Sequence, residues 1–150
     1  MRSANTSRPL FIDTNAFVAL FDEDDEHYEA ADTIFNRINR GELPYGPLFT
    51  SRYVLAETAT AIRFGVGHRE AVEALSTVRN SSSINVLEAG GGIFDRTATQ
   101  FEQYDDQMIS FVDHMNAVLA DEYDIDHIFA FDSDFATLDL IRVPVDTGDM

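Results

Sequence analysis

The sequence predicts one α/β domain in which a parallel sheet is covered by helices on both faces. Short apolar runs of strand length alternate with longer stretches that repeat apolar residues at helical spacing. The runs are apolar almost throughout, as strands buried on both faces are. The chain has 150 residues, 45% of them hydrophobic, which suffices for one core but not comfortably for two. We therefore expect a single three-layer α/β domain over residues 1–150.

Five short segments bounded by turn residues have the composition of strands. They are LFID at 10–13, PLFTS at 47–51, INVLE at 84–88, HIFAFD at 127–132 and RVPV at 142–145. Six stretches between them have helical periodicity, namely 15–22, 26–40, 53–65, 69–80, 93–104 and 110–124. We expect residues 1–8, ahead of the first strand, to be a flexible segment. No repeat or linker divides the chain.

Charge is the unusual bulk property. The chain has 27 acidic and ten basic residues, all of them Arg, and a formal net charge of −17. Such a charge repels itself in dilute buffer and is tolerated in salt, where the Debye length falls to about 3 Å at 1 M. The acids are interleaved with apolar residues, which favours a solvated surface in a salt-rich, halophilic cytoplasm. The alternative is a mimic of nucleic acid or a sink for a basic partner.

Composition excludes several classes of protein. Without Cys there is no disulfide framework, thiolate nucleophile or Cys-based zinc site. No apolar stretch approaches the roughly 18 residues of a membrane span, and the first residues lack the apolar centre of a secretory signal. We expect a cytoplasmic protein without membrane association.

Two predicted strands end on an acidic residue. Asp13 and Asp132 are the last residues of the first and fourth strand segments. Ligands of open α/β sheets bind beyond the carboxyl ends of the strands. If the two strands are neighbours, the two carboxylates lie side by side. The alternative for each is helix capping, in which Asp is favoured.

Two helical segments carry an acid beside their apolar stripe. Glu57 shares a helical face with Val54 and Ala61, and Asp113 shares one with Ala117. Acids are rarely buried unless they are paired or bind metal. A solvated helix edge is the alternative for either residue taken alone.

Four carboxylates in one place need protons or a cation. Two unit charges about 4 Å apart repel by roughly 4 kcal/mol at an effective dielectric constant of 20. Ligation by oxygen alone favours Mg²⁺ or Mn²⁺. The expected chemistry is hydrolysis of a phosphodiester.

Four stretches together resemble the motif regions of PIN-domain nucleases, most closely VapC-like toxins of prokaryotic toxin–antitoxin modules. They are FIDTNAFVALFDEDDEHYEAA, TSRYVLAE, SFVDHMNAVLA and FAFDSDF, and they occur in the family's order. The resemblance implies that Asp13, Glu57, Asp113 and Asp132 form an acidic quartet that binds divalent metal. It also implies that Asp134 is a supporting or alternate ligand. Asn15 matches a polar residue that hydrogen-bonds within the site.

The same resemblance implies a metal-dependent endoribonuclease with an RNA substrate, an antitoxin partner and a homodimeric state. It further implies a five-stranded parallel sheet with the first and fourth strands adjacent. Ala130 departs from the family's usual Thr, which removes a hydroxyl close to Asp132.

Two other functions stay open. One is a catalytically inactive PIN-like binding module, against which the four acids argue and which the missing hydroxyl at Ala130 leaves open. The other is an α/β phosphatase with Asp13 as nucleophile, although Asn15 stands where a second Asp is usual. A receiver domain would need a Lys, and the chain has none.

Three further features are less informative. The acids at 22–26 are either a second cation site or, as we prefer, acids in the first turn of a helix. His27 matches a residue common at that place in the family, and we expect it to pack. Five arginines are candidates for phosphate contact or ordinary solvated residues: Arg37, Arg40, Arg52, Arg63 and Arg69.

Overall fold

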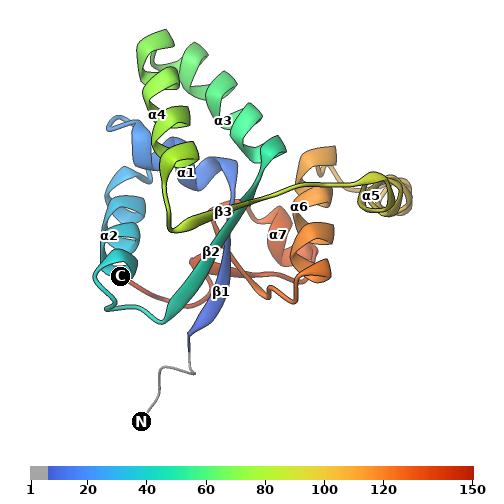
Figure 1. Ribbon diagram of the computed structural model, residues 1–150. Helices are drawn as coiled ribbons and strands as arrows, with labels where there is room; N and C mark the ends of the chain where they lie inside the picture. The colour runs from blue at the N-terminus through green and yellow to red at the C-terminus, as the bar shows by residue number, and fades with distance from the viewer. Residues whose placement is uncertain (1–6) are drawn as a thin grey trace.

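The computed structural model describes residues 7–150, which form five strands and seven helices. The strands are β1 (Arg8–Ile12), β2 (Tyr45–Ser51), β3 (Ile84–Leu87), β4 (His127–Ala130) and β5 (Ile141–Pro144). The helices are α1 (Thr14–Phe21), α2 (Tyr28–Asn39), α3 (Arg52–Gly65), α4 (His68–Asn80), α5 (Gly91–Gln103), α6 (Phe111–Glu122) and α7 (Asp134–Thr137). The strands make one parallel sheet in the order β3-β2-β1-β4-β5 (Figure 1). This confirms the predicted α/β fold.

The centre of the sheet is formed by β1 and β4. Leu10 pairs with His127 and Ile12 pairs with Phe129, so the first and fourth strands are adjacent, as expected. Leu10, Phe11 and Ile12 are fully buried, because helices cover both faces of the strand. The carboxyl ends of β1 and β4 therefore meet at one edge of the sheet, which we call the carboxyl edge.

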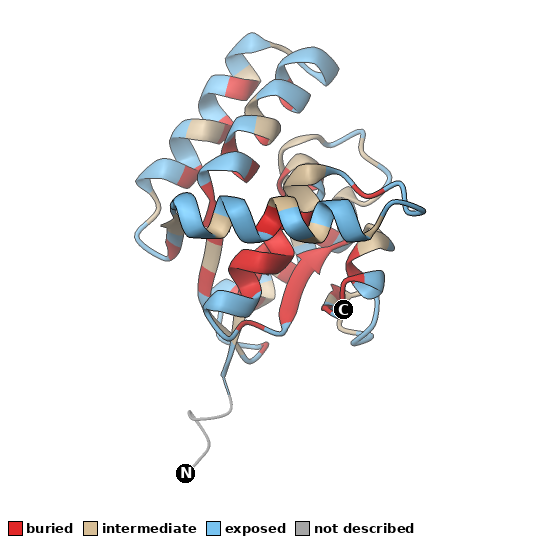
Figure 2. Ribbon diagram, turned by 90° about the vertical axis from the view of Figure 1, so that its right-hand side faces the viewer, coloured by how far each residue is buried: buried red, intermediate tan, exposed pale blue. Residues whose placement is uncertain are grey.

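Helices form the outer layers. Figure 1 shows α2 on one side of the sheet and α5 with α6 on the other. Helix α6 is buried from His114 to Ala120, and Figure 2 shows it in red behind the pale blue α5. Helices α3 and α4 pack against each other beyond the carboxyl edge. Within residues 7–150, no helix is long and apolar enough to cross a membrane.

Most predicted elements are found, with shifts of a few residues at their ends. β1 begins at Arg8, so the expected flexible segment is wrong at that residue, and residues 1–6 lie outside the described chain. Asp13 follows β1 as the N-cap of α1, and Asp132 lies two residues beyond β4. Helix α7 was not predicted, because four residues are too few to show helical periodicity.

The acids at 22–26 precede α2 and are not in its first turn, in which Glu29 is the acidic residue. The carboxylate of Asp22 accepts from the backbone N–H of Asp24 at 3.0 Å, and that of Asp25 accepts from the backbone N–H of His27 at 2.8 Å. These acids therefore build the turn between α1 and α2 by closing side-chain to backbone bonds.

Candidate metal centre

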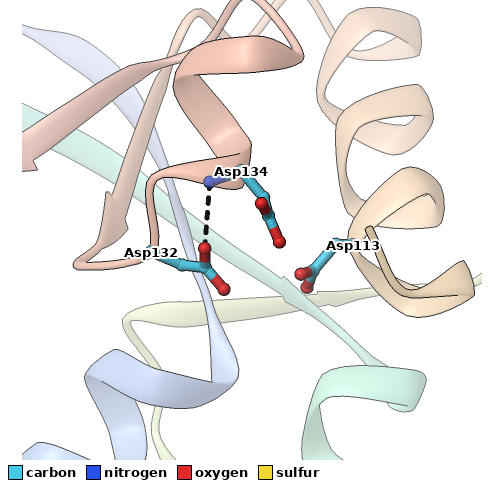
Figure 3. Close-up of side chains that lie close together, drawn as sticks. All are labelled: Asp113, Asp132 and Asp134. Carbon is cyan, nitrogen blue, oxygen red and sulfur yellow. Dashed lines mark hydrogen bonds between the residues drawn. The ribbon is translucent and has the colours of Figure 1, made fainter. Parts of the chain in front are cut away.

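Three aspartates meet at the carboxyl edge. Asp113, Asp132 and Asp134 each offer a carboxylate oxygen, and these oxygens all lie within 4.8 Å of one another (Figure 3). Asp113 comes from the first turn of α6, Asp132 from the loop after β4, and Asp134 from the start of α7. Three separate segments thus converge on one point.

Local hydrogen bonds hold these segments in place. The side chain of Ser110 caps α6 by accepting from the backbone N–H of Asp113 at 3.1 Å. The carboxylate of Asp132 accepts from the backbone N–H of Asp134 at 2.9 Å. Because Asp113 lies in the first turn of α6, its carboxylate points toward the strand ends instead of following the buried stripe of the helix.

Asp13 lies beside this group and is only 2% exposed. Its backbone N–H donates to the carbonyl of Phe129 at 3.1 Å, which ties it to the end of β4. Its carboxylate accepts from the backbone N–H of Asn15 and from the side-chain amide of Asn116, both at 3.3 Å. Asp13 therefore caps α1, the alternative weighed from the sequence, and at the same time faces the other acids.

Glu57 enters from the far side, on α3. The hydroxyl of Thr14 donates to its carboxylate at 3.0 Å. Neither Glu57 nor Asp13 belongs to the closest set of three oxygens. The four acids of the expected quartet thus lie at one edge of the sheet. The three closest carboxylates, however, are those of Asp113, Asp132 and Asp134, and Asp13 and Glu57 lie outside this close set.

Burial and mutual repulsion change how these acids titrate. Burial, with smaller contributions from the charges of Glu57 and Asp132, raises the pKa of Asp13 from 3.8 to about 7. Burial and the charges of the neighbouring acids raise the pKa of Asp113 to about 8. Burial also raises the pKa of Asp134, and Asp132 adds to that effect.

The cluster has no ion-pair partner among the described side chains. No Arg or His of residues 7–150 forms an ion pair with any of its acids. Like charges this close require protons or a positive ion. A set of oxygen ligands without a basic partner is the arrangement that suits a hard divalent cation.

Two residues of the site were not identified as such from the sequence. Asn116 is fully buried and donates to Asp13, while its carbonyl oxygen has no partner within the described chain. A buried Asn inside the otherwise apolar stretch MNAVLA was the available signal. Thr14 donates its hydroxyl to Glu57, a contact between α1 and α3 that sequence spacing does not reveal.

Asn15 contributes its backbone N–H to Asp13, and its side chain is exposed. No hydrogen bond of the Asn15 side chain is formed within residues 7–150. The expected hydrogen bond within the site is therefore a backbone bond. The side chain instead lines an adjacent cleft with Asp132.

The arginines are distributed unevenly around the sheet. Arg37 and Arg40 pair with Glu42 at the end of α2, beside the start of β2 and so at the edge opposite the acids. Arg52 stands at the carboxyl edge, where it pairs with Glu88 at 2.5 Å and is 74% exposed. Of these three arginines, only Arg52 lies at the same edge of the sheet as the acids.

Comparisons with known proteins agree with this arrangement. The family model described as PIN domain matches residues 10–140. The 23S rRNA-specific endonuclease VapC20 of Mycobacterium tuberculosis is 28% identical over 134 residues, covering 89% of this chain and 97% of that protein. Its crystal structure, described as that of a sarcin–ricin loop cleaving toxin, superposes with a TM-score of 0.79 at 26% identity, covering 88% of this chain and 96% of that one.

Two more distant structures share the fold. VapBC2 from Rickettsia felis, bound to a DNA fragment from its promoter, gives a TM-score of 0.62 at 15% identity, with 89% of this chain and 96% of that chain covered. FitAcB from Neisseria gonorrhoeae gives a TM-score of 0.59 at 13% identity, with 89% of this chain and 95% of that chain covered. The chain therefore belongs to the PIN-domain family and is homologous to the VapC toxins.

Proposed function

We propose that this protein is a divalent-metal-dependent endoribonuclease and the toxin of a toxin–antitoxin pair. The observation that supports this most is the convergence of the Asp113, Asp132 and Asp134 oxygens within 4.8 Å at the carboxyl edge. Similarity to VapC20, which is named as an rRNA-specific endonuclease, makes RNA the substrate class that we propose.

The residues present fit a divalent ion. Every ligand is a carboxylate oxygen, as Mg²⁺ and Mn²⁺ prefer, and the acids are short of positive charge. We assign Asp113, Asp132 and Asp134 as the holders of the ion, with Asp13 and Glu57 completing the proposed catalytic set. A bound ion supplies positive charge at the scissile phosphate.

The other residues keep these acids in position. Asn116 holds one oxygen of Asp13 from α6, and the backbone of Asn15 holds the other from α1. The hydroxyl of Thr14 fixes Glu57 on the opposite wall. Such fixed hydrogen bonds orient metal ligands and are needed for full activity in metal sites.

An inactive binding module is the second candidate, and Ala130 is the residue that favours it. Ala130 is fully buried and offers no hydroxyl to Asp132. The backbone N–H of Asp134 already bonds Asp132 at 2.9 Å, which supports an active site without that hydroxyl. Membership of the PIN family and the exposed Asn15 side chain argue against the phosphatase alternative.

We further propose an antitoxin partner, a homodimer and a cytoplasmic location. The similarity to structures named VapBC2 and FitAcB supports the antitoxin. An open groove lined by Thr14, Glu57 and Ala61 runs beside the acids and could receive a partner segment that offers Arg or Lys to them. Exposed Phe64 and Val72 on α3 and α4 are apolar surface that a second chain would cover.

The test is cleavage of purified rRNA and of a synthetic structured hairpin in Mn²⁺ or Mg²⁺, with and without chelator. We expect cleavage that the chelator and Asp113→Asn each abolish. Asp95→Asn, an exposed acid on α5, is the matched control and should cleave at the wild-type rate. Cleavage that persists in Asp113→Asn or in excess chelator would contradict the proposal.

A further inference from the structure

A cleft beside the acid cluster has one aromatic wall. It has a volume of about 320 Å³ and is open to solvent. Six residues line it: Asn15, Asp25, Glu26, His27, Phe131 and Asp132. Because Asp132 also belongs to the close set of aspartates, the cleft adjoins the place where a scissile phosphate would lie.

The aromatic wall is a stack of two parallel rings. The imidazole of His27 and the ring of Phe131 have centroids 4.1 Å apart and planes only 2° apart. Phe131 packs on the core and meets Phe129 edge-on at 6.3 Å. His27 packs as expected, but its side chain remains 43% exposed, so the outer part of the stack is accessible to solvent.

The turn before α2 fixes the backbone that carries this ring. The backbone N–H of His27 is held by the carboxylate of Asp25 at 2.8 Å, and the preceding turn is closed by the bond from Asp24 to Asp22. A flat ring that is backed by the core and held by its own turn needs no rearrangement to receive another ring. Single-stranded RNA is bound by such rings, on which its unstacked bases stack.

We propose that this cleft binds the RNA base next to the scissile phosphate, stacked on His27, and that it prefers guanine. The proposal rests on the proposed ribonuclease function and names a base subsite for it. The base would extend the stack that Phe131 and His27 form.

The preference for guanine follows from the polar groups at the edge of the stack. Glu26 places a carboxylate oxygen 3.4 Å from Nε2 of His27, at the rim of the ring, and Asp25 and Asp132 add further carboxylates. A carboxylate only accepts hydrogen bonds. Guanine is the base that presents two adjacent donors, N1–H and the N2 amino group, which one carboxylate can accept together. The other three bases present an acceptor beside each donor on that edge.

The experiment measures RNA binding separately from cleavage. The protein carries Asp113→Asn to prevent cleavage, and the probe is a fluorescein-labelled single-stranded RNA with one guanine or one adenine in an otherwise uridine sequence. Fluorescence anisotropy, measured without added divalent metal, gives the Kd. Adding His27→Ala should raise the Kd for the guanine RNA about tenfold, the loss of one stacked base. His27→Phe should keep stacking and stay within about twofold of its parent.

Two further variants separate stacking from base recognition. Glu26→Gln should bring the guanine and adenine affinities close together while leaving the adenine affinity unchanged. His68→Ala, at the exposed start of α4, is the matched control and should change neither affinity. A melting curve for each variant confirms that it is folded, and Glu26→Gln, being exposed, serves as the test if His27→Ala does not fold.

The outcomes distinguish the subsite from the catalytic function. Unchanged affinity and unchanged base preference in both His27→Ala and Glu26→Gln would overturn the subsite, even if the wild-type protein cleaves RNA. A loss of affinity in His27→Ala without any preference for guanine would overturn the guanine assignment. Wild-type protein that binds guanine RNA through His27 but never cleaves it would support the subsite and contradict the nuclease.

Discussion

Replacing Asp13 with Asn should stabilise the metal-free protein while abolishing cleavage. Asp13 is 2% exposed, and in the metal-free fold its carboxylate loses hydration without gaining a cation. The amide has nearly the same shape and carries no charge. The variant therefore removes the repulsion within the cluster together with one member of the proposed catalytic set.

The pKa of Asp13 sets the size of the effect. A pKa raised from 3.8 to about 7 means that the folded state holds this proton more tightly than the unfolded chain does. Below about pH 4 the carboxyl is protonated in both states and contributes nothing. Between pH 4 and 7 only the unfolded chain ionises, so wild-type stability falls as pH rises.

Above pH 8 wild type loses the full folding free energy that ionising the buried Asp13 carboxylate costs. At about 1.36 kcal/mol for each pKa unit it is about 4 kcal/mol. The amide of Asn has one oxygen, so it can accept only one of the two hydrogen bonds that the Asp13 carboxylate accepts. The lost hydrogen bond reduces the gain in stability by about 1 kcal/mol. We expect the free energy of unfolding of Asp13→Asn to exceed that of wild type by about 3 kcal/mol at pH 8. This corresponds to a melting temperature about 10 °C higher.

The assay is urea unfolding in EDTA at pH 4, 6 and 8, with Asp95→Asn as the control. The control acid is exposed on α5 and should change stability by less than about 0.5 kcal/mol at every pH. A stability difference for Asp13→Asn that grows from pH 4 to pH 8 agrees with the reasoning. A variant that is no more stable than wild type at pH 8 would refute it.

Three other predictions concern the support of Glu57, the arginines and the net charge. Thr14→Val removes the hydroxyl bond to Glu57 and should lower kcat about tenfold with KM little changed, as steady-state kinetics will show; an unchanged kcat would mean that Glu57 needs no support. Arg52→Ala should weaken RNA binding severalfold more than Arg37→Ala, because only Arg52 stands at the acid edge; equal effects in an anisotropy titration would contradict this. With a net charge of −17, the melting temperature and the cleavage rate at fixed Mn²⁺ should both rise up to about 1 M KCl, and a steady fall of both would point instead to a basic partner.

The fold was largely predictable because its signals are local. The runs 10–13 and 127–132 are apolar nearly throughout, and both became central buried strands. Their acids were predicted to lie together because parallel strands share a carboxyl edge. α7 was missed because one turn of helix has no measurable period.

The arrangement of the acids needed the structure. The position of Asp134 depends on the turn after β4, and that of Asp113 on where α6 begins. Both are set by single hydrogen bonds that periodicity does not encode. The exposure of His27 was equally hidden, since a His that packs on one face and is open on the other looks in sequence like a packed one.

The most direct test of the metal centre is calorimetric titration of the protein with Mn²⁺ at pH 7. Because the pKa values of Asp13 and Asp113 are raised to about 7 and about 8, part of the cluster is protonated at this pH, and binding must release protons. The account predicts saturable binding whose measured enthalpy differs between PIPES and Tris buffers, since the two take up protons with different heats. It also predicts that Asp113→Asn loses this binding and that Asp95→Asn keeps it. Wild-type protein that gives no saturable Mn²⁺ binding, or binding that Asp113→Asn leaves unchanged, would contradict the assignment of these aspartates to a metal site.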